Sequence, residues 1–265
     1  MPDELVGHAD AIAAWFEARG YRVRVEHKEV AYPYTPTLFC KRQSTTVLVE
    51  VDRKPPLERM LEWTRYCRSC NRDTRIALGM PDDVQRSPRE DAVLRENGAG
   101  LYLVGDAVVE AITPRDLALS MELPKLDAMP KKLQRALGAV YEHFERSHWR
   151  EGFEEACIVL ETHARKYLAK GMRSGRIVLV NKNDSLSKTQ AADVARMTLG
   201  QLAAAYAKIQ IPSHADGTIA QVLARINADR IAVAHYKRTA AAEKRLRLNV
   251  GQHMWSVVSA LRELL

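Results

Sequence analysis

The chain has 265 residues, enough for one large domain or two ordinary ones, each with its own buried core. Its hydrophobic content of 46%, charged content of 28% and formal net charge of +7 are typical of a globular protein rather than a fibrous or disordered one. No apolar run approaches the roughly 20 residues of a membrane-spanning helix, and Met1-Pro2-Asp3-Glu4 is not followed by the apolar core of a secretory signal. We therefore expect a cytoplasmic protein that has no contact with a membrane.

The charge is divided unevenly along the chain. Up to Pro124 there are 17 Lys and Arg against 20 Asp and Glu, whereas from Lys125 onward there are 23 against 13. The positive net charge therefore belongs entirely to the C-terminal half. A field of that sign attracts a polyanion such as a nucleic acid, although a solvated helical surface rich in Lys and Arg has the same composition.

The N-terminal half alternates between helical and strand patterns. Residues 6–19 have the spacing of an amphipathic helix that Gly20 ends. Further helices are predicted near 57–70 and 88–97, and strands at 21–26, 37–40, 45–51, 75–81 and 100–105. The order helix, three strands, helix, strand, helix, strand predicts a compact α/β domain with a mixed sheet.

The order of elements in residues 6–112 resembles the restriction-endonuclease-like (PD-(D/E)XK) fold. In that family an Asp on the second strand and a Glu-x-Lys on the third hold a divalent metal and position the attacking water. Carboxylates bind hard cations, and a lysine helps to activate the nucleophile. Here Glu50 matches the family's Glu, Asp52 stands where the family has Lys, and Pro36-Thr37 replaces the expected Pro-Asp.

These departures leave two interpretations of the N-terminal site. In one, Glu26 on the preceding strand substitutes for the missing acid and Lys54 reaches in from the strand end, which would give a Mg²⁺-dependent nuclease. In the other, which we favour, Glu50 and Asp52 are solvated or structural, and the domain is a degenerate relative that binds a ligand or a protein partner. Mg²⁺ is therefore expected only under the first interpretation, and no other cofactor is expected.

The four cysteines do not indicate a metal site. Cys67-Arg68-Ser69-Cys70 has the C-x-x-C spacing, but it lies in a predicted helix without a second pair of ligands. A tetrahedral zinc site needs four ligands. We expect reduced thiols and no bound metal.

The C-terminal half is predicted to be helical. Helical spacing occurs near residues 128–146, 151–171, 189–208, 218–238 and 250–264, and a short strand-like piece at 177–180 interrupts it in a loop or hairpin. The segment 123–130 contains two prolines and is the predicted linker. We therefore predict an α/β domain at 1–122 and an all-α domain at 131–265.

One motif in the fourth of these helices suggests chemistry. Arg230 and His235 are separated by four residues. His has the unperturbed pKa best suited to moving a proton near neutral pH, and Arg presents a planar fork that fits phosphate. The pair indicates chemistry on a phosphodiester, although Arg and His at this spacing must recur often by chance.

Residues 128–265 resemble the HEPN superfamily, helical bundles whose active members cut RNA with an R-x(4–6)-H motif in a late helix. The segments 156–161 and 197–202 also look familiar from that family. The resemblance implies a metal-independent endoribonuclease in which His235 acts as general acid or base around the ribose 2′-hydroxyl and Arg230 stabilises the charge developing on the phosphorane. A polar residue commonly follows the family's Arg, whereas Ile231 follows here, so Asp229 is the candidate for that orienting role.

Further polar residues surround the motif. Asn227 and Tyr236 are expected to orient the pair or to bind phosphate, and Lys237 and Arg238 to hold the RNA backbone. Positions five apart on a regular helix are separated by about 140° around its axis, so the Arg and the His cannot both face one narrow cleft from one straight helix. HEPN proteins are typically dimers with a shared cleft, and the resemblance therefore implies a homodimer built through the C-terminal half.

Three functions remain open from the sequence. The first is a dimeric, metal-independent endoribonuclease, as in a toxin or an antiphage defence effector, whose N-terminal domain is a sensor or binding platform. The second is a non-catalytic nucleic-acid-binding or scaffold protein, in which His235 is a core histidine and Arg230 pairs with Asp229 or Glu243. The third is a Mg²⁺-dependent DNA nuclease that uses the N-terminal domain.

Overall fold

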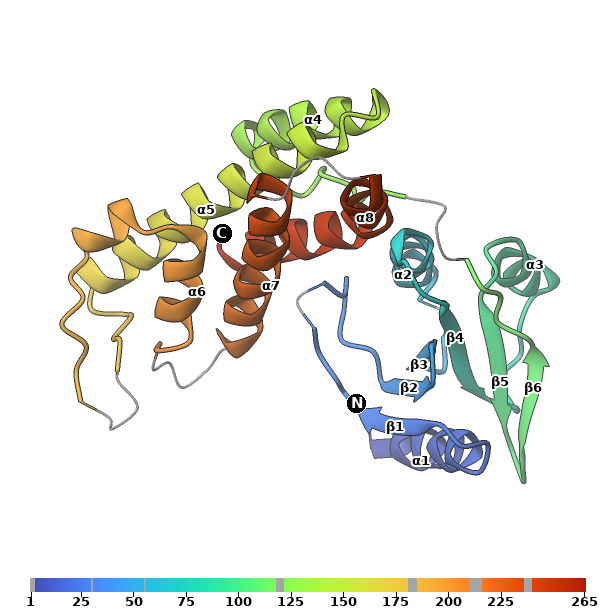
Figure 1. Ribbon diagram of the computed structural model, residues 1–265. Coiled ribbons are helices and arrows are strands. Elements are labelled where there is room, and N and C mark those ends of the chain that lie inside the picture. The colour runs from blue at the N-terminus through green and yellow to red at the C-terminus, as the bar shows by residue number, and fades with distance from the viewer. Residues whose placement is uncertain are drawn as a thin grey trace. The chain divides into compact units, whose positions relative to one another are not determined.

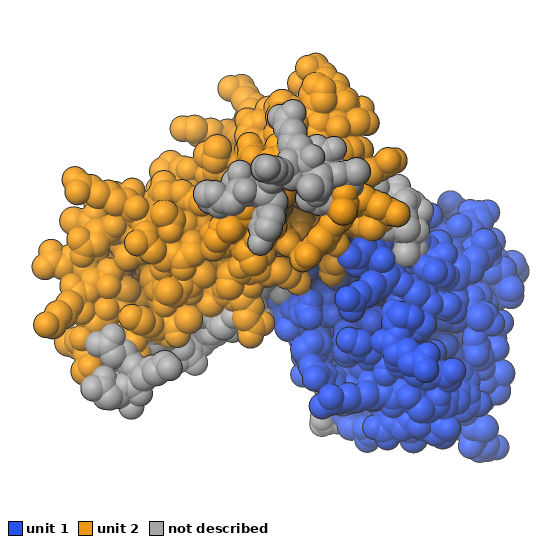
Figure 2. Space-filling view, viewed as in Figure 1, with its two compact units in different colours: residues 1–124 blue, residues 125–265 orange. Residues whose placement is uncertain are grey.

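The computed structural model describes residues 3–29, 31–54, 56–117, 122–180, 185–209, 216–235 and 240–265. It divides into two compact units, residues 1–124 and 125–265, which Figure 2 distinguishes by colour. The described residues form a six-stranded mixed sheet and eight α-helices, so the predicted combination of an α/β part and a helical part is confirmed at this level. No helix in these ranges is both long and apolar enough to cross a membrane.

Unit 1 is built on a sheet whose strands lie side by side in chain order (Figure 1). Strands β1 to β3 are antiparallel, β3 to β5 are parallel, and β6 returns antiparallel to β5. The strands are β1 (Arg22–Val25), β2 (Leu38–Arg42), β3 (Thr45–Val51), β4 (Thr74–Pro81), β5 (Gly100–Val104) and β6 (Val108–Ile112). Strand β6 was not predicted from the sequence, although four of its five residues are apolar; it is a short edge strand with three exposed residues.

Three helices pack on this sheet. Helix α1 (Asp3–Glu17) lies against all six strands on one face, whereas α2 (Leu57–Ser69) and α3 (Pro88–Glu96) connect the parallel strands. Side chains alternate along β3, so Val49 packs towards α1 and Glu50 points to the face that α2 covers. Gly79 on β4 permits the close approach of α1, since a Cβ there would collide with Ile12.

Unit 2 is a set of helices around α5, which contacts α4, α6, α7 and α8 (Figure 1). The helices are α4 (Lys131–Glu145), α5 (Trp149–Arg173), the 3₁₀ helix η1 (Asp193–Arg196), α6 (Leu199–Tyr206), α7 (Asp216–His235) and α8 (Ala240–Glu263). At 177–180 there is no regular strand, only isolated bridges from Leu179 to Ile209 and from Val180 to Leu186.

Two helix predictions in unit 2 need correction. The single helix predicted at 189–208 is η1 followed by α6, because Thr198 and Gln201 form a capping box that starts a new helix. Helix α8 begins ten residues before the predicted start at 250. The earlier start brings Arg245 and Asn249 into the same helix as His253.

Candidate functional site

Glu50 is the centre of the N-terminal candidate site, and it is 4% exposed. Its Oε1 accepts hydrogen bonds from Arg59 Nη2 at 2.9 Å and from Trp63 Nε1 at 3.1 Å, and Thr37 Oγ1 donates to Oε2 at 3.4 Å. Burial raises the pKa of the Glu50 carboxyl, and the charge and hydrogen bonds of these partners offset part of that increase. Of the two roles expected for Glu50, solvated or structural, its burial and contacts fit the structural one.

Glu26, Asp52 and Lys54, the other residues of the predicted nuclease site, make hydrogen bonds that involve nearby backbone groups. Glu26 lies just after β1 rather than on a strand, in an exposed turn with φ of 47°, and its backbone N–H donates to Thr37 O at 3.0 Å. Asp52 Oδ1 accepts from the backbone N–H of Lys54 at 3.1 Å, and the Lys54 side chain is exposed. Thr37, which replaces the first acid, supplies a hydroxyl to Glu50 instead of a second carboxylate.

These residues do not fit a Mg²⁺ site. Mg²⁺ is held by oxygen ligands in near-octahedral geometry, whereas the guanidinium of Arg59 already neutralises the Glu50 carboxylate. Within the described ranges, no group of three or more His, Cys, Asp or Glu side chains could hold a metal ion. No step of a reaction can therefore be derived through a metal at this position.

Cys67 and Cys70 are buried at the end of α2. Burial raises the pKa of the Cys70 thiol to about 11 and that of Cys67 well above its ordinary value. The thiolate is the nucleophile and the metal ligand, so thiols with a raised pKa are unsuited to either role at neutral pH. This C-x-x-C pair belongs to the core of unit 1.

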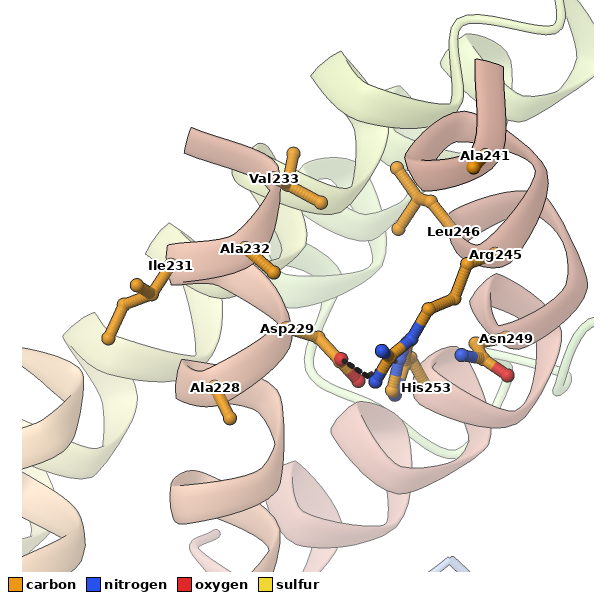
Figure 3. Close-up of a pocket in the computed structure, with 10 residues that line it drawn as sticks. All are labelled: Ala228, Asp229, Ile231, Ala232, Val233, Ala241, Arg245, Leu246, Asn249 and His253. Atoms are coloured by element: carbon orange, nitrogen blue, oxygen red, sulfur yellow. Dashed lines mark hydrogen bonds and ion pairs between the residues drawn. The ribbon is translucent and has the colours of Figure 1, made fainter. Parts of the chain in front are cut away.

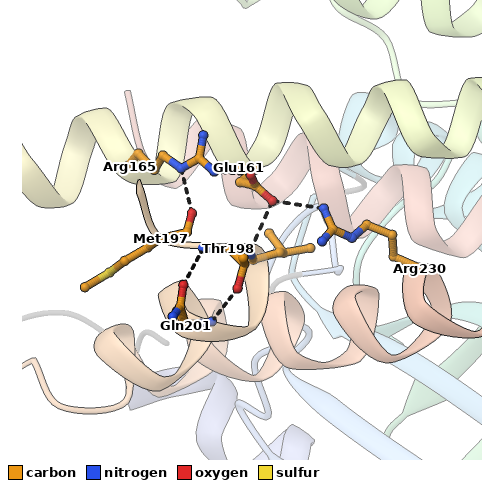
Figure 4. A network of polar contacts seen from close by, with 7 residues as sticks. Glu161, Arg165, Met197, Thr198, Gln201 and Arg230 are labelled. Atoms are coloured by element: carbon orange, nitrogen blue, oxygen red, sulfur yellow. Dashed lines mark hydrogen bonds and ion pairs between the residues drawn. The ribbon is translucent and has the colours of Figure 1, made fainter. Parts of the chain in front are cut away.

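In unit 2, the Arg230 side of α7 faces α5 and α6 (Figure 4). Arg230 Nη1 donates to Glu161 Oε2 at 3.0 Å, and the backbone N–H of Leu199, the first residue of α6, donates to the same oxygen at 3.1 Å. Arg165 donates to the other carboxylate oxygen of Glu161. The Glu161 and Arg230 side chains are 13% and 30% exposed, so this ion pair is partly buried.

Among the described residues, Glu161 is thus the acidic partner of Arg230, and the expected partner Asp229 contacts other residues; the side chain of Glu243, the other expected partner, lies outside the described part of the structure. Asn227 lies against α6: a Cβ on Gly200 would be 2.9 Å from Asn227 Nδ2, so the glycine allows this close approach. The structure therefore gives Asn227 a part in the packing of α6 on α7.

Asp229 contacts a different set of residues, on the side of α7 that faces α8 (Figure 3). Its Oδ1 accepts a hydrogen bond from Arg245 Nη2 at 3.3 Å, and its Oδ2 lies 2.9 Å from His253 Nε2. The contact with His253 and the charge of Arg245 lower the pKa of Asp229 below its ordinary value of 3.8, against the effect of partial burial. Asp229 and Arg230 are adjacent in α7, but Asp229 contacts residues of α8 and Arg230 contacts a residue of α5.

A pocket of about 670 Å³ lies between α7 and α8 beside this contact. Its polar side chains are Asp229, Arg245, Asn249 and His253, and the rest of its lining is aliphatic: Ala228, Ile231, Ala232, Val233, Ala241 and Leu246. Sequence reasoning missed this pocket. A signal was present, since Arg245, Asn249 and His253 recur every fourth residue and such residues share one helix face.

The end of α7 carries the second motif residue. His235 is the last residue of α7, and its side chain lies outside the described part of the structure. Tyr236, Lys237 and Arg238 also lie outside the described residues. Two residues before His235, the carbonyl of Val233 accepts a hydrogen bond from Arg150 of α5, which satisfies one of the carbonyls left open at a helix end. Helix α5 therefore holds α7 both at Arg230 and at its C-terminal turn.

Comparisons of the chain with protein-family models, curated proteins and solved structures gave no match.

Replacing Glu50 with Ala should destabilise the protein by about 2–3 kcal/mol, because Arg59 and the buried indole N–H of Trp63 lose their acceptor. Urea-induced unfolding followed by tryptophan fluorescence measures this change. Glu58→Ala, at an exposed position of α2, the helix that carries Arg59 and Trp63, is the control and should change stability little. Adding Arg59→Met to Glu50→Ala should recover part of the loss. Unchanged stability of Glu50→Ala would contradict the structural role.

Asp229→Asn should reduce stability at neutral pH but not in acid. A lowered pKa in the folded state means that ionised Asp229 stabilises the fold above its unfolded pKa, and that this contribution is lost as pH falls through the folded pKa. We expect a loss of about 1–2 kcal/mol at pH 7 that shrinks below about pH 4. Urea unfolding between pH 7 and pH 3 tests this, with Asp127→Asn as an exposed control of equal charge change. A difference in the free energy of unfolding between Asp229→Asn and the wild type that does not change with pH would refute this prediction.

Proposed function

We propose that the protein is a metal-independent endoribonuclease whose reaction is carried out by Arg230 and His235. The observation that supports this most is that both residues belong to one helix, α7, in which the Arg230 guanidinium is held in place by Glu161 of α5. The helical character of unit 2 and its excess of Lys and Arg also agree with the resemblance to the HEPN superfamily.

The two side chains would divide the reaction between them. His235 takes the proton from the ribose 2′-hydroxyl, the 2′-oxygen attacks phosphorus, and the bond to the 5′-oxygen breaks as that oxygen receives a proton from water. Arg230 stabilises the negative charge on the phosphorane. A guanidinium has five N–H donors, and the described contact of Arg230 with Glu161 uses Nη1. The products are a 2′,3′-cyclic phosphate and a 5′-hydroxyl, so DNA is not a substrate by this route.

The active unit is proposed to be a homodimer. Arg230 is turned towards Glu161, and helical periodicity separates position 235 from position 230 by about 140°. One copy of a regular helix therefore does not bring both groups to the same narrow cleft. In a dimer with a two-fold axis beside α7, one cleft is formed by both subunits, so that Arg230 of one subunit and His235 of the other line the same cleft.

Unit 1 is proposed to be a degenerate restriction-endonuclease-like domain that serves as a sensor or binding platform. The order of α1, β1, β2, β3, α2 and β4 agrees with that resemblance, and the pairing of Glu50 with Arg59 would leave this carboxylate unavailable to a metal. A ligand or protein partner at unit 1 that controls an RNA-cutting unit would suit a cytoplasmic toxin or an antiphage defence effector.

A second candidate function is a non-catalytic RNA-binding protein. One observation favours it: the charge of Arg230 is already paired with Glu161, which also binds the first N–H of α6. In that case Arg230 would serve the packing of unit 2, and the basic surface would still attract RNA.

The first test is cleavage of labelled RNA and DNA by the full chain, each with EDTA or with Mg²⁺. RNA cleavage should persist in EDTA, yield 2′,3′-cyclic ends and fall at least about 100-fold in His235→Ala, since the acid–base group is lost. His148→Ala, an exposed histidine of the same unit, should retain activity. RNA binding without cleavage would instead favour the second candidate, and DNA cleavage that needs Mg²⁺ and Glu50 would contradict both.

The second test asks whether the two motif residues act across a dimer. Arg230→Ala and His235→Ala subunits are co-expressed with different tags so that they mix. If each cleft takes Arg230 from one subunit and His235 from the other, half of the dimers contain one intact cleft, and activity should recover to about a quarter of the wild-type value. Each variant alone should stay inactive. Failure to recover activity in a purified mixed dimer would show that both residues act within one subunit.

A further inference from the structure

Strand β1 is one open edge of the sheet in unit 1 (Figure 1). Of the strands that the structure describes, only β2 pairs with it. An open edge presents a row of backbone N–H and C=O groups on which a further strand can form. Native proteins often protect such an edge with a proline or a bulge, but Arg22–Val25 contains no proline, and its pairing with β2 runs without a shift of register.

The outward-facing backbone groups of β1 belong to its two valines. The N–H of Glu26, just after β1, donates to Thr37 O at 3.0 Å, and hydrogen-bonded pairs occur at every second residue of an antiparallel ladder. The two arginines of β1 therefore bond to β2, whereas the N–H and C=O groups of Val23 and Val25 point away from it. Val25 is also 56% exposed. A strand added at this edge would form its hydrogen bonds with these two valines.

Three cations lie on one face of this edge. Arg22 and Arg24 share a face because they are two residues apart in a strand, and Lys41 of β2 lies directly opposite Arg22. All three residues are exposed, and none of them has an ion-pair partner among the residues that the structure describes. Up to Pro124 the chain has 17 Lys and Arg against 20 Asp and Glu, so these cations are a local exception in an acidic unit. The edge therefore attracts negative charge.

The same charges decide which strand can pair with β1. Like charges directly opposite each other destabilise a sheet, whereas opposite charges stabilise it. A second copy that paired its own β1 with this one about a two-fold axis would bring the arginines of both copies together. A strand with an acidic residue at every second position would instead place carboxylates opposite Arg22 and Arg24. Its remaining side chains would lie beside Val23 and Val25, so an alternation of acidic and apolar residues fits both faces of the edge.

We propose that β1 is the docking site for an extended acidic segment of a partner protein, which adds to the sheet as a further strand. The partner is a peptide rather than a nucleic acid, because the edge offers main-chain donors and acceptors at the spacing of a strand as well as positive charge. The inference rests on the proposed role of unit 1 as a sensor or binding platform, and it names the class of partner that the platform binds. It does not depend on RNA cleavage by unit 2.

Fluorescence anisotropy of a labelled peptide in which glutamate and valine alternate tests the proposal with the full chain. Two further versions of the peptide carry backbone N-methyl groups, one version on every valine and the other on every glutamate. Only alternate N–H groups of a strand face its partner, so one version should lose binding at least about tenfold and the other should stay within about threefold. A peptide with glutamine in place of glutamate should also bind at least about tenfold more weakly, because it lacks the charges that pair with the arginines.

Two variants of the protein test the edge itself. Arg24→Glu should weaken binding of the glutamate peptide at least about fivefold and should bind a lysine–valine peptide more tightly than the wild type does. Arg89→Glu makes the same change of charge at an exposed position of α3 and should stay within about twofold. Val25→Pro removes an N–H that points away from β2, so it should weaken peptide binding at least about fivefold and leave the β1–β2 ladder intact, with circular dichroism as the check on folding.

The outcomes separate this proposal from the proposed function. Equal effects of the two N-methylated peptides, or equal effects of Arg24→Glu and Arg89→Glu, would overturn the docking site. Binding of a single-stranded oligonucleotide in place of the peptide, weakened by Arg24→Glu but not by Val25→Pro, would identify a nucleic-acid surface and overturn it as well. Peptide binding by a protein that cuts no RNA contradicts the ribonuclease but not the docking site, and RNA cleavage without peptide binding contradicts only the docking site.

Discussion

The arrangement of unit 2 depends on the carboxylate of Glu161. A largely buried carboxylate must be compensated by hydrogen bonds or opposite charge, and Glu161 meets this need with groups from three helices. Arg165 comes from its own helix, Arg230 comes from α7, and the N–H of Leu199 comes from the first turn of α6, where the helix dipole also favours a negative charge. One side chain of α5 therefore contacts the first residue of α6, whose start is set by the Thr198–Gln201 capping box, and also holds α7 at Arg230.

The rotation of α7 decides which of its residues can act together. Successive residues of a helix point about 100° apart, so Asp229 and Arg230 serve different neighbours although they are adjacent in sequence. Arg230 faces α5, where it contacts Glu161, and Asn227 packs against Gly200 of α6. Asp229 faces α8 and its polar stripe. Helix α7 thus has one face that holds the partly exposed Arg230 against α5 and another face that lines the pocket beside α8.

Features governed by local pattern were predictable from the sequence, and features governed by tertiary contacts were not. The run of Val and Thr in residues 45–51 predicted β3 with the bounds observed, whereas the short edge strand β6, with three exposed residues, was missed. Arg230 was found through its spacing from His235. Glu161 is 69 residues away from it in sequence, so no spacing rule could have linked the two. His253 could have been found, had the start of α8 been placed early enough to reveal the stripe that begins at Arg245.

Both units contain a carboxylate paired with an arginine, yet the pairing has opposite consequences for chemistry. In unit 1 the group that would bind a metal is Glu50, which is 4% exposed and committed to Arg59 and Trp63, so pairing removes the reactive group. In unit 2 the group that would act is Arg230, which keeps 30% of its side chain exposed and has more N–H donors than the contact with Glu161 uses. There the pairing orients the Arg230 guanidinium and leaves part of the side chain exposed. The same interaction therefore argues against catalysis in unit 1 and is compatible with it in unit 2.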